Sequence, residues 1–195
     1  MILVIMGVTG SGKTTIGTLL ASRMGWEFAE GDAYHSKENV AKMHAGIPLT
    51  DEDREPWLRA LHEVLLGWYK AGKSGVLACS ALRQKYRDVL AEGIPRSEIS
   101  FVLLEAPKSV LMERLSHRPG HFMNPALLDS QLATLEMPSD ALRVSVVQPP
   151  AQAVEQILNE IKQSQEQQQR SEQERSEQQR SGQQISARQS QSTGS

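Results

Sequence analysis

The chain has 195 residues, a formal net charge of −2 and 39% hydrophobic residues. Lys and Arg do not outnumber Asp and Glu (21 against 23), so the composition gives no basic excess for a nucleic-acid or anionic-membrane partner. No run approaches the ~18 apolar residues of a transmembrane helix, and one cysteine, Cys79, allows no intrachain disulfide. We therefore expect a cytoplasmic protein with neither nucleic acid nor membrane as a partner.

Apolar runs of strand length alternate with segments of helical periodicity. The start, MILVIMGVTG, is too short and lacks the basic residues of a signal peptide, so it is expected to be a strand. The expected strands are 2–6, 26–32, 75–80, 99–105 and 143–148. The expected helices are one from Lys13, then 36–45, 50–72, 82–91, one from Pro107 to Pro119, 125–136 and 150–162. This alternation predicts an α/β fold, a parallel sheet covered by helices on both faces, with ligands at the carboxyl ends of the strands.

Residues 163–195 differ in composition from the rest of the chain. They consist almost entirely of Gln, Ser, Glu and Arg, in a degenerate five-residue repeat around Arg170, Arg175 and Arg180. Apart from Ile185 the segment has no large apolar residue, so it cannot form a packed core. We expect a domain at 1–162 and a disordered tail at 163–195, with binding of a partner by the tail as the alternative.

The stretch GVTGSGKT at residues 7–14 fits the phosphate-binding pattern G-x-x-x-x-G-K-[ST]. It follows a strand and opens a helix, so main-chain N–H groups and the helix dipole would meet the phosphate. A chance glycine-rich turn is the alternative, and it does not explain that context. Lys13 is expected to bridge the β- and γ-phosphates of ATP, and the Thr14 hydroxyl to hold Mg²⁺. The residues expected at the nucleotide are Gly7, Val8, Thr9, Gly10, Ser11, Gly12, Lys13, Thr14 and Thr15.

The second strand ends in GDAYH, across the expected cleft from the phosphate loop. Asp32 lies where a carboxylate could hold a substrate hydroxyl and take its proton during attack on a phosphoryl group. A helix cap or a turn residue is the alternative reading of Asp32. Beside a phosphate loop, we favour the catalytic role.

Four separated stretches carry a family resemblance: GVTGSGKT, GDAYHSKENVAKMHAGIPLTDEDREPWL, ACSALRQKYRD and GHFMNPALLDSQLATLE. In this order they resemble the gluconokinases of the shikimate-kinase-like branch of P-loop kinases, over about residues 1–162. The resemblance implies ATP-dependent phosphorylation of D-gluconate to 6-phosphogluconate, which feeds the pentose phosphate and Entner–Doudoroff routes. It also implies a three-layer P-loop kinase fold with a five-stranded parallel sheet, a substrate-binding helical segment, a mobile lid and a homodimer.

The resemblance suggests roles for several polar residues. Arg54 matches an arginine that anchors acid substrates, and a guanidinium can grip a carboxylate with two hydrogen bonds; an i,i+4 surface pair is the alternative. His35 would donate to a substrate hydroxyl, unless it is merely structural. Arg83 matches a substrate-facing position, whereas Arg87 could equally pair with a surface carboxylate. Lys85 is expected to be solvated.

Three further segments complete the expected site. Ser80 ends the third strand and would contact ligand or magnesium, or else cap a helix, and Gln131 would face the substrate. The segment RLSHRPGHFMNP resembles the lid: Arg114 and Arg118 would share a helix face at the nucleotide, and His121 would descend onto the substrate. Arg118 would stabilise the migrating phosphoryl group, a contribution commonly worth about 10³–10⁵ in rate. An ordinary loop with solvated arginines is the alternative.

One departure from common P-loop proteins concerns the metal. No strand ends in four apolar residues and an aspartate, so Thr14, nucleotide oxygens and water would hold Mg²⁺, with possible help from Asp32. Kinases of shikimate, adenylyl sulfate or another sugar acid are alternatives; ACSALR lacks the three glycines usual in shikimate kinases. A non-catalytic nucleotide-binding interaction protein is disfavoured because Lys13, Asp32 and Arg118 are all present. We expect direct in-line transfer without a phosphoenzyme.

Overall fold

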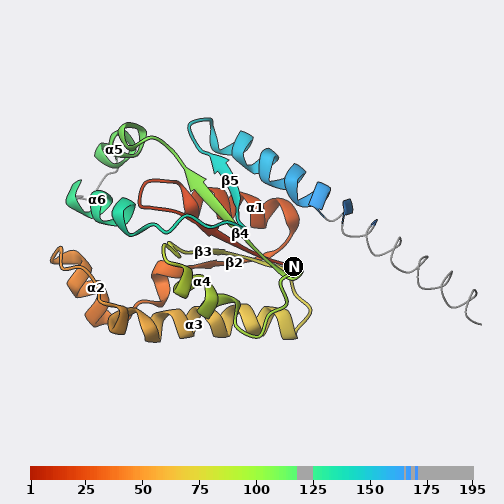
Figure 1. Cartoon of the computed structure of the whole chain (residues 1–195), viewed down its shortest axis with the longest axis horizontal. Coiled ribbons are helices and arrows are strands. Elements are labelled where there is room, and N and C mark those ends of the chain that lie inside the picture. Colours follow the sequence, from red (N-terminus) through yellow and green to blue (C-terminus); the bar gives the residue numbers. More distant parts are fainter. Residues whose placement is uncertain (118–124, 165, 168–169, 171–195) are drawn as a thin grey trace, which may run out of the picture. The chain divides into compact units, whose positions relative to one another are not determined.

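The computed structural model describes residues 1–117, 125–164, 166–167 and 170 (Figure 1). The strands are β1 (Ile2–Met6), β2 (Glu27–Glu30), β3 (Gly75–Ala78), β4 (Ile99–Glu105) and β5 (Leu142–Ser145). The helices are α1 (Lys13–Met24), the 3-10 helix η1 (Gly31–Tyr34), α2 (Lys37–His44), α3 (Asp51–Lys70), α4 (Gln84–Ala91), α5 (Lys108–Ser116) and α6 (Pro125–Thr134). Residues 150–164 form a further helix. The chain divides into two compact units, Met1–Ile157 and Leu158–Ser195, and the fold below is that of the first.

The five strands form one parallel sheet in the order β2-β3-β1-β4-β5. The predicted five-stranded parallel sheet is therefore confirmed. Strand β1 lies between β3 and β4, so the chain leaves β1 where the strand order reverses. This reversal opens a crevice at the carboxyl ends of the strands, and ligands bind there in open α/β sheets.

Helices cover both faces of the sheet (Figure 1). Helix α1 packs on β1, β2 and β3, and α3 packs on β1 and β3 from the other face. Helix α4 lies against α3. An ion pair of Arg23 with Glu155, 2.5 Å, joins α1 to the last helix. The structure thus has the predicted arrangement, a parallel sheet covered by helices on both faces.

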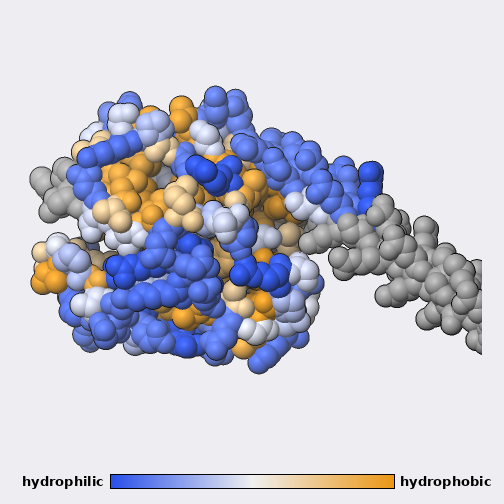
Figure 2. All heavy atoms as spheres, viewed as in Figure 1, coloured by the Kyte–Doolittle hydropathy of each residue, from blue (hydrophilic) through white to orange (hydrophobic). Residues whose placement is uncertain are grey.

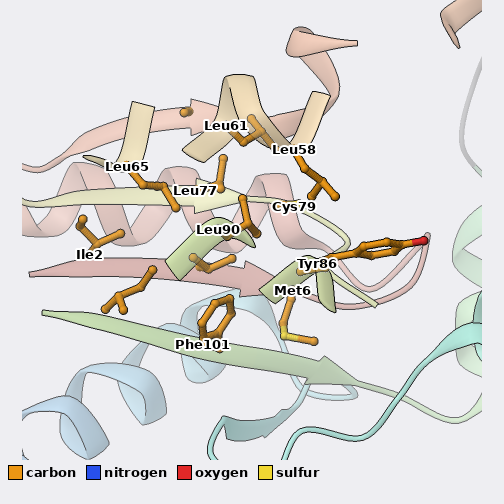
Figure 3. Close-up of a cluster of buried hydrophobic side chains, with 14 of the residues drawn as sticks. Ile2, Met6, Leu58, Leu61, Leu65, Leu77, Cys79, Tyr86, Leu90 and Phe101 are labelled. Atoms are coloured by element: carbon orange, nitrogen blue, oxygen red, sulfur yellow. The ribbon is translucent and has the colours of Figure 1, made fainter. Parts of the chain in front are cut away.

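The core on the α3 side of the sheet explains the apolar spacing of α3. Leu58, Leu61 and Leu65 recur at helical intervals and are buried against Leu77 of β3 and Leu90 of α4 (Figure 3). Tyr86 lies at the end of this cluster, with its hydroxyl pointing away from the apolar residues. Among the described residues, no helix is long and apolar enough to cross a membrane.

The start of α3 has the capping chemistry that its sequence indicates. Thr50 accepts a hydrogen bond from the Asp53 N–H, 3.2 Å, and the Asp53 carboxylate accepts one from the Thr50 N–H, 3.0 Å. This reciprocal pair sets the first turn of α3 and therefore the positions of Asp51 and Arg54.

Candidate active site

The phosphate-loop residues lie between the end of β1 and the start of α1. Gly7, Gly10 and Gly12 all have positive φ, 141°, 77° and 90°. A Cβ at Gly7 would lie 2.8 Å from the Leu104 carbonyl oxygen, so no larger residue fits there. Gly12 is the N-cap of α1 and supplies no side-chain cap. The amino-terminal N–H groups of α1 therefore face the loop uncapped, and this arrangement suits a phosphate.

Lys13 is held by the main chain of the same loop. Its Nζ donates to the Val8 carbonyl oxygen, 3.2 Å, and the Ser11 N–H donates to that oxygen as well, 3.3 Å. The Ser11 hydroxyl is fully buried next to Gly7. The loop is thus already folded into a tight turn around its lysine.

Asp32 follows β2, at the same edge of the sheet. It lies in η1 and is exposed. Gly31, just before it, passes so close to β3 that a Cβ there would lie 2.6 Å from the Ala78 carbonyl oxygen. The Trp57 indole N–H donates to the Gly31 carbonyl, 2.7 Å, from the other side. The backbone that carries Asp32 is therefore confined between β3 and α3.

The electrostatics of Cys79, just after β3, indicate which charges converge there. Burial raises the pKa of the Cys79 thiol to about 12, and Lys13 opposes this rise whereas Asp32 and Glu30 add to it. Lys13 follows β1, Asp32 follows β2 and Cys79 follows β3, and these parallel strands are neighbours in the order β2-β3-β1. The structure therefore brings the lysine of the loop and the predicted base together at the carboxyl ends of β1, β2 and β3.

Glu30 is a candidate that sequence reasoning missed. It is the last residue of β2, and one of its carboxylate oxygens is buried with no hydrogen-bond partner among the described residues. An unpaired buried carboxylate oxygen is rare and suits a ligand, water or cation. Its position two residues before Asp32, at a strand end, is the signal that could have found it.

His35 lies beside Asp32, as its sequence position suggests. Its ring stacks on that of Trp57, and its Nδ1 is buried without a hydrogen-bond partner among the described residues. Burial lowers the pKa of His35, and Arg54 lowers it further, against the opposing charge of Asp32. A neutral imidazole is therefore favoured next to Asp32 and Arg54.

Arg54 is anchored at the start of α3. Its Nη1 donates to the Leu49 carbonyl, 2.6 Å, and its guanidinium carbon lies 5.8 Å from the centre of the Tyr86 ring. No ion pair of Arg54 with a carboxylate occurs in the part of the chain that the structure describes. The alternative of an i,i+4 surface pair is therefore not what the structure contains.

Asp51 gathers the polar side chains at the start of α4. It accepts hydrogen bonds from Arg83, 3.1 Å, from Lys85, 2.5 Å, and from the Tyr86 hydroxyl. The bonds from Lys85 and then Tyr86 lower the pKa of Asp51 to about 2. Lys85 was expected to be solvated; its side chain is 55% exposed, and the structure adds the ion pair with Asp51.

The surroundings of Asp51 carry a surplus of positive charge. The guanidinium carbons of Arg54 and Arg83 and the Nζ of Lys85 each lie 5.8–5.9 Å from the centre of the Tyr86 ring. The Asp51 carboxylate forms ion pairs with Arg83 and Lys85. Hydrophilic side chains dominate the molecular face over α3 and α4 (Figure 2). Three cations against two carboxylates, Asp51 and the adjacent Glu52, leave a net positive charge that favours a further anionic group, such as the carboxylate of a sugar acid.

The loop after β3 is held from inside the protein. The Ser80 carbonyl accepts from the Gly7 N–H, 3.3 Å, and Ala81 is buried with φ 44°. Arg87 is 2% exposed and donates to the Ala81 carbonyl, 3.0 Å, and the Glu136 carbonyl, 3.1 Å. Arg87 was expected either to face substrate or to pair at the surface; it does neither, because its guanidinium satisfies buried carbonyls. Ser80 does not cap α4, whose N-cap is Arg83.

Two further predicted residues, Arg114 of α5 and Gln131 of α6, form hydrogen bonds with main-chain groups. Arg114 of α5 donates to the Val146 carbonyl, after β5. Gln131 of α6 accepts from the Thr9 N–H of the phosphate loop, 2.6 Å. Gln131 was expected to face the substrate, but its oxygen is bound to the loop itself. Arg118 and His121 lie outside the described residues.

The described residues contain no group of three or more His, Cys, Asp and Glu side chains that could hold a metal ion. The Thr14 hydroxyl is exposed in the first turn of α1. A cation bound here would therefore depend on few protein ligands, of which Thr14 and the unpaired oxygen of Glu30 have suitable chemistry.

Comparison with known proteins agrees with this geometry. A family model described as shikimate kinase matches residues 9–192, which extends beyond the range of the sequence resemblance. A gluconokinase of Gluconobacter oxydans (strain 621H) is 49% identical over 160 residues, 80% of this chain and 88% of that protein. A probable gluconokinase of Dictyostelium discoideum is 46% identical over 145 residues, 72% of each chain.

A solved structure gives the same result in three dimensions. The crystal structure of a gluconokinase from Sinorhizobium meliloti 1021 superposes with a TM-score of 0.75 at 46% sequence identity, over 83% of this chain and 91% of that chain. The phosphate loop, the parallel sheet and these matches agree. The chain therefore belongs to the gluconokinases of the shikimate kinase family.

Proposed function

We propose that this protein transfers the γ-phosphoryl group of ATP to the 6-hydroxyl of D-gluconate, giving 6-phospho-D-gluconate and ADP. Phosphorylation of gluconate with ATP follows from its membership of the gluconokinases. The observation that carries the finer proposal is the position of Lys13 and Asp32 after β1 and β2, the two strands that flank β3, together with a cluster of three cations around Tyr86. A phosphate site, a base and an anion site are what a kinase of a sugar acid needs.

The mechanism that we infer is one direct in-line transfer. The loop of residues 7–14 cradles the phosphates, and Lys13 neutralises charge on the group that moves. Asp32 orients the 6-hydroxyl of gluconate and accepts its proton during attack. Arg54 and Arg83 bind the carboxylate, and His35, in its neutral form, contacts a hydroxyl between the two ends. By the resemblance to gluconokinases, Arg118 would stabilise the migrating phosphoryl group and His121 would contact gluconate.

Magnesium fits the chemistry of the residues at the loop. Bound Mg²⁺ would supply positive charge against the phosphates of ATP. The Thr14 hydroxyl would contact it directly, and the unpaired buried oxygen of Glu30 would hold one of its water molecules. Two hydrogen bonds support the site: the Ser80 carbonyl accepts from the Gly7 N–H, and the Arg114 guanidinium donates to the Val146 carbonyl.

An assay of ADP release tests this function and its base together. The purified protein is offered gluconate, shikimate, other aldonic acids or no acceptor, and we expect rapid turnover with gluconate alone. Asp32→Asn should lower kcat by at least about 10²-fold, the scale of a lost general base. Asp88→Asn, an exposed change on α4, is the matched control and should leave kcat unaltered. Near-normal turnover of Asp32→Asn would remove Asp32 from the mechanism.

The wider organisation is also a proposal. Residues 1–162 form the catalytic domain, two copies associate as a homodimer, and the enzyme works in the cytoplasm, in keeping with its one buried cysteine. Light scattering on the purified protein measures the number of copies. A mass of one chain across the micromolar range would contradict the dimer.

A further inference from the structure

A hydrogen bond joins two parts of the chain that are 122 residues apart. The main-chain N–H of Thr9 donates to the side-chain oxygen Oε1 of Gln131, at 2.6 Å. Because a main-chain N–H is always a donor, its partner must be the oxygen of the amide and not its nitrogen. The bond therefore fixes the orientation of the Gln131 amide as well as the direction of the Thr9 N–H.

The Thr9 N–H shares a peptide plane with the carbonyl of Val8. In a trans peptide the N–H and C=O bonds lie in one plane and point in opposite directions, so fixing one direction fixes the other. The Val8 carbonyl is the group that accepts from Lys13 Nζ, 3.2 Å, and from the Ser11 N–H, 3.3 Å. One rigid unit thus connects Gln131 to the ammonium of Lys13.

Apolar packing holds this part of the loop in place but does not orient the peptide. The Val8 side chain is buried among Leu82, Leu111, Leu115 and Leu128. A Cβ at Gly10 would lie 3.0 Å from Leu115. Rotation about the bonds on either side of the Val8–Thr9 peptide would turn its plane while these side chains stay in contact. Two directional hydrogen bonds oppose that rotation: the Ser11 N–H binds the Val8 carbonyl from within the loop, 3.3 Å, and Gln131 binds the Thr9 N–H from α6, 2.6 Å.

We propose that Gln131 is a positioning residue for Lys13, and that it acts through the Val8–Thr9 peptide and not through contact with gluconate. The inference depends on the proposed role of Lys13 in binding ATP. Without the amide oxygen, the peptide samples orientations in which the Val8 carbonyl no longer holds the lysine. The ammonium then loses its preorganised place at the phosphates, so ATP binding weakens and gluconate binding does not.

Two substitutions separate this role from the others. Gln131→Met keeps the length of the side chain but removes the strong acceptor, and we expect the Kd of ATP to rise about fivefold, the scale of one lost hydrogen bond, with an unchanged KM for gluconate. Gln131→Glu keeps an acceptor oxygen, so hydrogen exchange at the Thr9 amide should stay slow in this variant and become faster in Gln131→Met. Gln152→Met, the same change at an exposed residue of the last helix, is the control and should alter neither constant.

A double-mutant cycle with Lys13→Met completes the test. We expect Lys13→Met alone to weaken ATP binding, and Gln131→Met added to it to change the Kd less than twofold, because the group that Gln131 positions is gone. Unchanged ATP binding in Lys13→Met would contradict the proposed function of the lysine. If Lys13→Met weakens binding but Gln131→Met does not, or adds its full effect to the double variant, or raises the KM for gluconate instead, the positioning role is overturned.

Discussion

The imidazole of His35 stacks on the indole of Trp57, with ring centroids 4.3 Å apart and an interplanar angle of 13°. Trp57 comes from α3, and its indole N–H also binds the Gly31 carbonyl, 2.7 Å. One buried aromatic side chain therefore fixes both the residue before Asp32 and the histidine after it. Helix α3 therefore connects Asp32, the proposed base, with Arg54 of the proposed anion site.

The His35–Trp57 stack predicts a dependence of stability on pH. Burial lowers the pKa of His35 below its ordinary 6.5, so the unfolded chain takes up this proton at a higher pH than the folded protein. Its contribution to the free energy of unfolding is full above about pH 6.5, and it is lost as the pH falls through the lower, folded-state pKa. Urea titrations between pH 7.5 and 5 should show this loss. His35→Gln should flatten the profile, and exposed His44→Gln should not; parallel profiles for all three proteins would contradict the prediction.

Two glycine-to-alanine substitutions should change the free energy of unfolding in opposite directions. In Gly31→Ala the new methyl group would lie 2.6 Å from the Ala78 carbonyl oxygen, so the backbone before Asp32 must shift, and both thermal stability and kcat should fall. In Gly67→Ala, in the exposed interior of α3, no atom lies within 4 Å. That change should raise the free energy of unfolding by about 0.5–1 kcal/mol, because alanine favours the helix. Chemical denaturation measures both, and a neutral Gly31→Ala would show that the strands can separate.

Arg87 should matter for stability more than for catalysis. Arg87→Met leaves the buried Ala81 carbonyl and the partly buried Glu136 carbonyl without their donor, which should cost about 1–3 kcal/mol. Arg59→Met breaks only exposed ion pairs with Glu55 and Glu92 and should change the free energy of unfolding much less than Arg87→Met does. Equal losses in the two variants, measured by urea unfolding, would show that Arg87 does not support the loop after β3.

Removal of the tail should change little. Residues 165–195 contain one large apolar residue, Ile185, so they have almost no apolar surface to contribute to a core. A protein that ends at Gln163 or Ser164 should keep the Tm and the turnover of the full chain. A drop in Tm of several degrees, or a changed KM for either substrate, would mean that the tail packs on the domain.

The strand and helix types could be predicted from the sequence because they depend on local patterns. Burial of every residue of β1, and of Leu58, Leu61 and Leu65 in α3, repeats the apolar periods of the chain. The expected strands at 26–32 and 75–80 run longer than β2 and β3, which end at Glu30 and Ala78. The difference has a cause: after Glu30 the chain turns into η1, which contains Asp32, and after Ala78 it leaves the extended conformation before Ala81, where φ is 44°.

The place of the glycine-rich loop between β1 and α1 could also be predicted, because its glycines adopt the positive φ that the tight turn requires. The partners of the arginines could not be predicted from the sequence. Arg83 and Arg87 are one helical turn apart, yet Arg83 binds Asp51 whereas Arg87 is buried on carbonyls. The sequence contains no local sign of this difference, because it depends on which neighbour, the start of α3 or the turn at Glu136, lies opposite each side chain.

The sequence by itself determined the family, the order of strands and helices, and the loop that holds phosphate, since each is encoded in residues that are close together along the chain. Only the tertiary structure decided that Gln131 binds Thr9, that Asp51 gathers Arg83 and Lys85, and that Glu30 has an unpaired oxygen. These contacts join residues as many as 122 positions apart. Their existence depends on how helices pack against the sheet, a property of the folded chain as a whole that no local pattern records.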